Sequence, residues 1–182
     1  MRFALRNDHE SPVEVIVEQT GVRRSLPPGL EFVVDWTWSG FAGLTFGADW
    51  IALSVPPGGT IEVADPVPAD VELWRSVPVL GECEVGEFLV HNATDAPLTT
   101  FWEPWCGGGD IAPQGDPMRV NWIGNTKGVG ICYEPGLVVF DDVGASFQAW
   151  LPDGEEVFTG RTLVAPLQCA DQQDDQPGAR GA

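Results

Sequence analysis

The sequence predicts an all-β protein made of two tandem, diverged β-sandwich or small-barrel units, each with about six or seven short strands. Turn-forming residues are abundant, with 22 Gly and 16 Pro among 182 residues, which favours many turns and few helices. Apolar and polar residues alternate, as they do from Val13 to Glu18, which is the pattern of a half-buried strand. Turn residues and apolar positions also recur in the same order in both halves, so we expect the two units to pack as a pseudo-symmetric pair.

This internal repeat begins with Phe3–Asn7 (FALRN), which matches Phe88–Asn92 (FLVHN) at an offset of 85 residues. A proline follows five residues after each of these segments. After one inserted residue the offset becomes 86, and at this offset Leu53 is aligned with Val139. Because the matches fall on turn residues and on alternating apolar positions, they indicate one fold repeated twice.

The repeat sets the expected domain boundaries. The first β repeat covers 1–76, a connector 77–86, the second β repeat 87–160 and a C-terminal extension 161–182, which we expect to be disordered from about 170 because of its polar composition. The expected strands lie near 3–7, 12–18, 30–36, 41–46, 49–55, 60–64 and 70–74, and near 87–91, 97–103, 117–122, 128–133, 136–140, 145–150 and 156–159.

The net charge limits the possible partners. The chain has 27 acidic and 9 basic residues and a formal net charge of −18. It therefore repels phosphate, which excludes nucleic acid and an anionic membrane as partners. The charge can serve solubility alone, or it can form an acidic surface for a basic protein partner.

Neither a metal site nor a cofactor site is expected. The two histidines, His9 and His91, do not align with each other in the repeat, and no pair of cysteines has the spacing of a zinc site. No acidic cluster has the spacing of a calcium loop. The N-terminus has no apolar leader and no stretch is long enough to span a membrane, so we expect a cytoplasmic protein with reduced thiols. Its cysteines are Cys83, Cys106, Cys132 and Cys169.

The eight tryptophans fall into two groups. Trp36 and Trp122 align across the repeat, so we expect both in the core. Trp38, Trp50 and Trp105 stand beside turns and have no aligned Trp. They could form an exposed aromatic platform for a sugar or a peptide, or they could cap the ends of the sandwich.

The segment 101–110 (FWEPWCGGGD) combines three aromatic residues, a thiol and a glycine run. It differs strongly from the matching segment of the first half, which suggests a specialised function. Glu18 and Glu103 occupy matching positions and could act as a general acid/base pair, or each could accept a hydrogen bond from a turn in its own repeat. The predicted binding residues are Trp102, Glu103, Trp105, Asp110, Glu18, Trp38 and Trp50.

No catalytic motif is present, and no catalytic residue is predicted. The sequence therefore favours a non-enzymatic binding or scaffold protein, which docks a protein partner through acidic and Trp-bearing loops of the second repeat. Two alternatives stay open. One is an acidic stoichiometric inhibitor of a basic partner, either of the immunity type or a nucleic-acid mimic. The other is an intracellular lectin-like or small-ligand-binding module.

Overall fold

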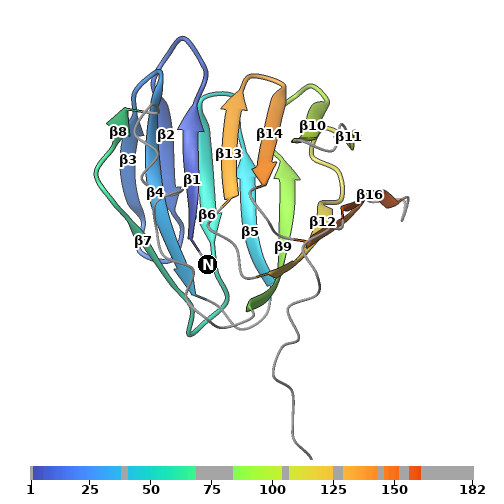
Figure 1. Cartoon of the computed structure of the whole chain (residues 1–182). Coiled ribbons are helices and arrows are strands. Elements are labelled where there is room, and N and C mark those ends of the chain that lie inside the picture. Colours follow the sequence, from blue (N-terminus) through green and yellow to red (C-terminus); the bar gives the residue numbers. More distant parts are fainter. Residues whose placement is uncertain are drawn as a thin grey trace, which may run out of the picture.

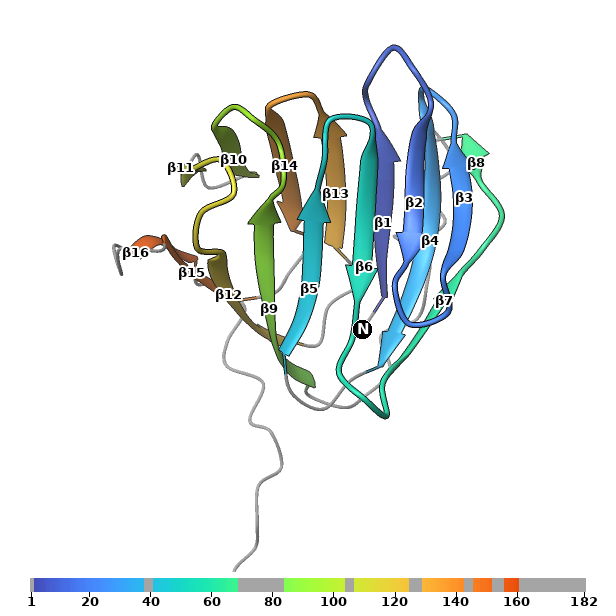
Figure 2. The same cartoon turned by 180° about the vertical axis from the view of Figure 1, so that it is seen from behind.

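The structure is a computed structural model that describes residues 2–37, 41–68, 84–103, 107–124, 129–142, 146–151 and 156–160. Within these ranges the regular structure consists of strands alone, in two eight-stranded sheets. The sheets pack face to face as a sandwich (Figures 1 and 2). The all-β class and the two-sheet sandwich are thus confirmed. The described part of the chain contains no helix that is long and apolar enough to cross a membrane.

The first sheet has the strand order β11-β10-β14-β13-β1-β4-β7, with β8 also paired to β4. Their bounds are β11 (Gly107–Ile111), β10 (Leu98–Glu103), β14 (Leu137–Asp142), β13 (Val129–Glu134), β1 (Arg2–Asn7), β4 (Leu30–Thr37), β7 (Thr60–Val63) and β8 (Val67–Pro68). The second sheet has the order β16-β15-β12-β9-β5-β6-β2-β3. Its strands are β16 (Glu156–Gly160), β15 (Ser146–Trp150), β12 (Met118–Gly124), β9 (Glu84–Asn92), β5 (Phe41–Phe46), β6 (Trp50–Ser54), β2 (Val13–Val17) and β3 (Val22–Leu26).

Each sheet combines strands from both halves of the chain. In the first sheet β1 pairs in parallel with β13, and in the second sheet β5 pairs in parallel with β9. The expectation that each half forms a sandwich of its own is therefore corrected, because the two halves share one sandwich. The expected boundaries at 76, 86 and 160 stay predictions.

The strand registers allow the two halves to be compared position by position. Phe3 lies opposite Val34 in the β1–β4 pair, and Phe88 lies opposite Val120 in the β9–β12 pair, which agrees with the offsets of 85 and 86. Farther along the chain the offset becomes 87.

The change to 87 corrects one part of the sequence alignment. Val17 lies opposite Leu53, whereas Trp102, its counterpart, lies opposite Phe140. Leu53 therefore corresponds to Phe140 and not to Val139. Every residue from 137 to 140 is apolar, so alternation gave no signal for the correct register.

The sequence did not predict β3 and β11. Each is the second strand of a hairpin, with β2 and β10 respectively, and each lies at the edge of its sheet. Their sequences, VRRSL and GGGDI, lack the apolar alternation of a half-buried strand because an edge strand buries little side-chain surface. The expected strand at 70–74 lies outside the described residues.

The core lies between the sheets and is rich in aromatic rings. Trp36 is 1% exposed, as predicted, whereas the side chain of Trp122 lies outside the described part. Phe46 of the second sheet stacks on Tyr133 of the first, with ring centroids 5.4 Å apart. Trp102 stacks on Phe140 with centroids 4.3 Å apart. Such pairs add to the stabilisation that area burial provides.

A buried asparagine fastens the chain where β1 ends. The Asn7 Nδ2 group donates hydrogen bonds to the carbonyl oxygens of Ser11 at 2.9 Å and Leu26 at 2.8 Å. Its Oδ1 accepts a hydrogen bond from the His9 N–H at 2.9 Å. One side chain thus ties the loop after β1 to the end of β3.

The second half repeats these contacts at the end of β9. The Asn92 Nδ2 group donates to the carbonyl oxygens of Ala96 and Ile111, both at 2.8 Å, and its Oδ1 accepts from the Thr94 N–H at 3.0 Å. Every partner lies 85 positions after its counterpart. Both asparagines are buried, with 0% and 2% exposure. Each side chain therefore supplies the backbone groups with hydrogen bonds that they cannot make to water.

We predict that Asn7→Ala and Asn92→Ala each lower the free energy of unfolding by about 2–4 kcal/mol, because each removes three side-chain hydrogen bonds and takes the side-chain donor from a buried carbonyl, that of Leu26 or Ile111. Urea denaturation followed by circular dichroism measures this. Ala96→Ser, at an exposed loop position that takes part in these contacts only through its backbone, serves as the control. A loss below about 0.5 kcal/mol in both asparagine variants would contradict the role given to these side chains.

Candidate binding surface at the loop end of the sandwich

Six loops gather at one end of the sandwich, because β1, β3, β5, β9, β11 and β13 all point toward it (Figures 1 and 2). We call this end the loop end. Its loops are 8–12, 27–29, 47–49, 93–97, 112–117 and 135–136. Backbone hydrogen bonds of 2.9 Å join the Asp8 N–H to the Tyr133 carbonyl and the Ala93 N–H to the Phe46 carbonyl. The loops are therefore short and anchored to the strands.

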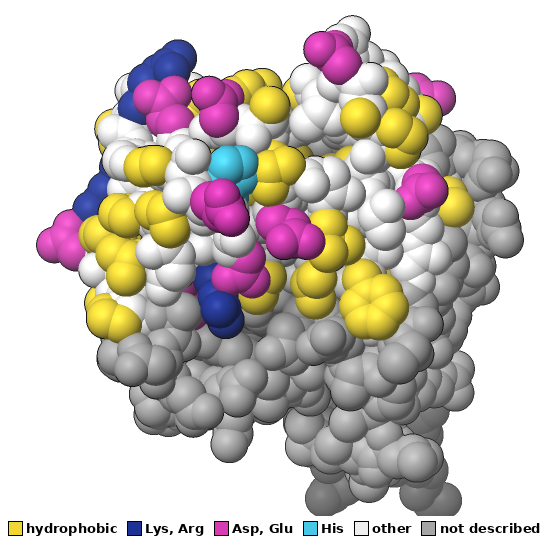
Figure 3. Space-filling view, turned by 90° about the horizontal axis from the view of Figure 1, so that it is seen from above, with side chains coloured by type: hydrophobic (Ala, Val, Ile, Leu, Met, Phe, Trp, Pro, Cys, Tyr) yellow, Lys and Arg dark blue, Asp and Glu magenta, His cyan; other side chains and the backbone are white. Residues whose placement is uncertain are grey.

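The loop end is acidic (Figure 3). Its six loops contain five exposed carboxylates and no Lys or Arg; the carboxylates are Asp8, Glu10, Asp49, Asp95 and Asp116. Asp8 forms an ion pair with Arg6 at 2.5 Å. Within the described residues, no ion pair joins the other four carboxylates to a cation.

His91, near the end of β9, adds no positive charge to this end at neutral pH. Partial burial lowers the pKa of its imidazole from the usual value of 6.5, and the Glu18 carboxylate opposes this only in part. A neutral imidazole therefore leaves the acidic character of the surface intact.

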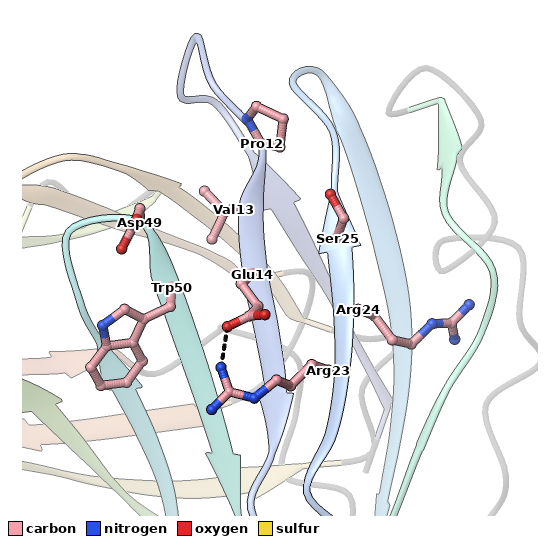
Figure 4. A pocket seen from close by; sticks show the side chains of 8 residues that line it. All are labelled: Pro12, Val13, Glu14, Arg23, Arg24, Ser25, Asp49 and Trp50. Atoms are coloured by element: carbon pink, nitrogen blue, oxygen red, sulfur yellow. Dashed lines mark hydrogen bonds and ion pairs between the residues drawn. The ribbon is translucent and has the colours of Figure 1, made fainter.

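A groove opens on the second sheet next to the loop end (Figure 4). It is an open hollow of about 400 Å³ across β2, β3 and β6. Its lining residues are Pro12, Val13, Glu14, Arg23, Arg24, Ser25, Asp49 and Trp50.

The polar side chains of the groove come from adjacent strands. Arg23 Nη1 donates to Glu14 Oε2 at 2.6 Å across the β2–β3 pair. The backbone N–H of Glu14 donates to the Asp49 carbonyl oxygen at 2.9 Å, which fixes the loop before β6 beside β2. Arg24 points away from the groove and binds Asp65 and the Ala64 carbonyl instead (Figure 4). The groove therefore holds two carboxylates and one guanidinium.

Trp50 forms the apolar side of the groove. Its indole packs directly over Gly47: a Cβ atom at Gly47 would lie 2.2 Å from the ring. Only glycine leaves room for the indole in this position. The side chain is half-buried, so the sheet fixes the ring while part of its surface stays open to solvent.

The other half of the chain does not carry this chemistry. By register, Thr99 corresponds to Glu14, Gly108 to Arg23 and Leu137 to Trp50. In place of the ion pair, the Thr99 hydroxyl group donates a hydrogen bond to Asp110 Oδ1 at 2.8 Å. The fold therefore forms with or without an ion pair and a Trp at these positions, and folding alone does not require them.

Only one of the predicted binding residues lies in the groove, and it is Trp50. The prediction of Trp102 as a binding residue must be corrected, because its side chain is 0% exposed and stacks within the core. It faces inward because it shares one face of β10 with Leu98 and Thr100, which are also buried. Asp110 is exposed on the first sheet, and Glu18 is exposed in the turn after β2, outside the six loops.

The remaining predicted residues are described only in part. Glu103 is the last residue of β10 in the first sheet, and its side chain lies outside the described residues, as do Trp38 and Trp105. β2, which Glu18 follows, and β10 belong to different sheets. The acid/base pair of Glu18 and Glu103 therefore stays a prediction. Within its described part, no three His, Cys, Asp or Glu side chains lie together as a metal site.

Sequence reasoning missed Glu14, Arg23 and Asp49. Glu14 is a polar position in an alternating segment, where a solvent-facing residue of any half-buried strand is expected. Arg23 lies on a strand that was not predicted. The available signal was the pair of opposite charges nine residues apart on either side of a Thr-Gly turn, which makes Glu14 and Arg23 diagonal neighbours across the β2–β3 hairpin.

Comparison with known proteins gives no lead to function. No protein family matches the sequence, and no characterised protein or solved structure is significantly similar to the chain.

Tyr133 connects the two sheets beneath the loop end. Its hydroxyl group donates to the Gly47 carbonyl and lies 3.3 Å from the Ala48 carbonyl. Burial and, to a smaller degree, the charge of Asp49 raise the pKa of the Tyr133 phenol to about 12. The neutral phenol is favoured in the folded protein, so its contribution to stability is complete below pH 10 and is lost as pH rises from 10 toward 12.

We predict that the phenol absorbance titrates with a midpoint near pH 12 in the native protein and near pH 10 in urea, the usual value for tyrosine. Tyr133 is the chain's single tyrosine, so the signal belongs to it alone. Circular dichroism at each pH shows whether the fold persists. A midpoint near 10 in a protein that is still folded would contradict the buried, hydrogen-bonded position of the ring.

Proposed function

We propose that the protein is a non-enzymatic binding protein that docks a basic protein partner on its loop end. The observation that carries this proposal is the set of five exposed carboxylates in loops without a single Lys or Arg. Attraction between such a surface and a basic one accelerates encounter and orients the partner. Rigid, short loops also lose little conformational entropy when a partner binds.

Both halves contribute to this surface. Asp8, Glu10 and Asp49 come from the first half, and Asp95 and Asp116 come from the second. The docking surface is therefore proposed for the loops of both halves, in place of Trp-bearing loops of the second half alone. The cytoplasm stays the proposed location.

A common origin of the two halves is part of the same proposal. The matching strand order, the matching registers and the matching bonds of Asn7 and Asn92 support a duplication of one unit. In such a duplication equivalent loops end up at the same end of the sandwich, and the docking surface is doubled.

The second candidate function is stoichiometric inhibition of a basic partner. The exposed carboxylates of the loop end favour it because they can occupy a site that the partner uses for a polyanion. Inhibition and simple docking differ in one respect: an inhibitor suppresses the activity of the protein it captures.

We predict that the double variant Asp95→Asn/Asp116→Asn captures at least about fivefold less of its partner from native lysate at low salt, because two attractive charges are removed. The control variant Glu18→Gln/Glu62→Gln changes the net charge equally at exposed positions outside the six loops and should capture as much as the unaltered protein. Quantitative mass spectrometry of the retained proteins gives the ratio.

Raising the salt to about 0.5 M should release the partner, since screening then acts over only a few ångströms. If the two variants lose capture equally, net charge is responsible rather than the loop end. A retained protein that is acidic, or that withstands high salt, would contradict the electrostatic proposal.

A further inference from the structure

We propose that the groove beside Trp50 is a binding site for a neutral saccharide, next to the acidic docking surface, with which it shares Asp49. A pyranose ring has one face of C–H groups and a rim of hydroxyl groups. It thus needs an aromatic face and hydrogen-bonding groups next to each other. The groove places Trp50 beside Glu14, Arg23 and Asp49 around a hollow of about 400 Å³.

The aromatic part of the site is fixed before any ligand arrives. The indole of Trp50 rests on Gly47, where no larger residue fits, and it remains half-buried with surface facing solvent. A ring held in place by the sheet loses little entropy on binding. A stacked ligand would therefore gain contact with a rigid apolar surface.

The polar groups suit hydroxyls better than other ligands. Glu14 and Arg23 share one hydrogen bond, which leaves several acceptor positions on the carboxylate and several donors on the guanidinium. A hydrocarbon ligand would remove these charges from water without replacing their hydrogen bonds. An anionic ligand would meet the carboxylates of Glu14 and Asp49, opposed by Arg23 alone, because Arg24 points away.

Folding does not explain why these residues stand together. The corresponding positions in the second half are Thr99, Gly108 and Leu137, and that half forms the same strand pairs. The charged pair and the Trp are thus additions to a framework that folds without them, as expected for residues that bind a ligand.

Nuclear magnetic resonance tests this proposal on the whole chain. The indole N–H signal of Trp50 is identified by its absence in Trp50→Leu, which introduces the side chain that Leu137 has at the corresponding position, and in Trp50→Phe. Unlabelled maltopentaose, cellopentaose, chitopentaose and mannopentaose are then titrated separately to about 10 mM, where weak single-site binding is still measurable. Trigalacturonate is the anionic comparison.

At least one neutral oligosaccharide should shift the Trp50 signal in a saturable manner while the indole signal of the buried Trp36 stays in place. Affinity should fall at least about tenfold in Trp50→Leu, because the stacking surface is lost, and less in Trp50→Phe. Arg23→Gln should weaken binding while the Trp50 signal keeps its position without ligand. The absence of a shift with all four neutral sugars, or tighter binding of trigalacturonate, would overturn the proposal.

Failure of the saccharide proposal can be distinguished from failure of the docking proposal. Trp50→Leu leaves Asp95 and Asp116 unchanged, so it should capture the basic partner as well as the unaltered protein does. If Trp50→Leu abolishes partner capture and no sugar binds, the groove belongs to the protein interface and the saccharide proposal is wrong.

Discussion

The structure depends on two parallel strand pairs, β1 with β13 and β5 with β9, because each joins strands from both halves of the chain into one sheet. Without them the first half would expose the unpaired backbone groups of β1 and β5, and the second half would expose those of β9 and β13. Unpaired strands of this kind are prone to aggregate. Parallel pairing makes β1 and β13 point the same way in the first sheet and β5 and β9 point the same way in the second. Both pairs point toward the loop end (Figure 1), which brings their loops together there. The topology thus gathers the acidic loops on one surface.

The asparagines hold this end in shape. Asn7 and Asn92 each close a loop onto the end of an edge strand, and Tyr133 ties the first sheet to the loop before β6. These bonds are made by buried side chains, so they persist while the carboxylates of the loops remain in solvent. The structure thus combines a rigid base with an exposed charged rim, which is favourable for electrostatic docking.

Much of the fold could be predicted from sequence, whereas little of the site could. Alternating apolar residues and paired turn signals located most strands, and the FALRN/FLVHN match led to the correct register of β1 and β9. β3 and β11 were missed because edge strands bury few side chains. Trp102 was misassigned because an aromatic residue beside a glycine run looks the same whether it points into the core or into solvent. Glu14 and Trp50 become neighbours only through the β2–β6 pairing, which a single sequence does not encode locally.

The most direct test of the docking surface is carboxylate labelling with a carbodiimide and glycine ethyl ester, carried out on the protein in low-salt native lysate and in buffer. Peptide mass spectrometry then reports the labelling of each acid. Our account predicts that the lysate protects Glu10, Asp95 and Asp116 at the loop end and leaves Glu18 and Glu62 labelled as in buffer. Equal labelling of all five residues in both media, or protection confined to Glu18 and Glu62, would contradict it.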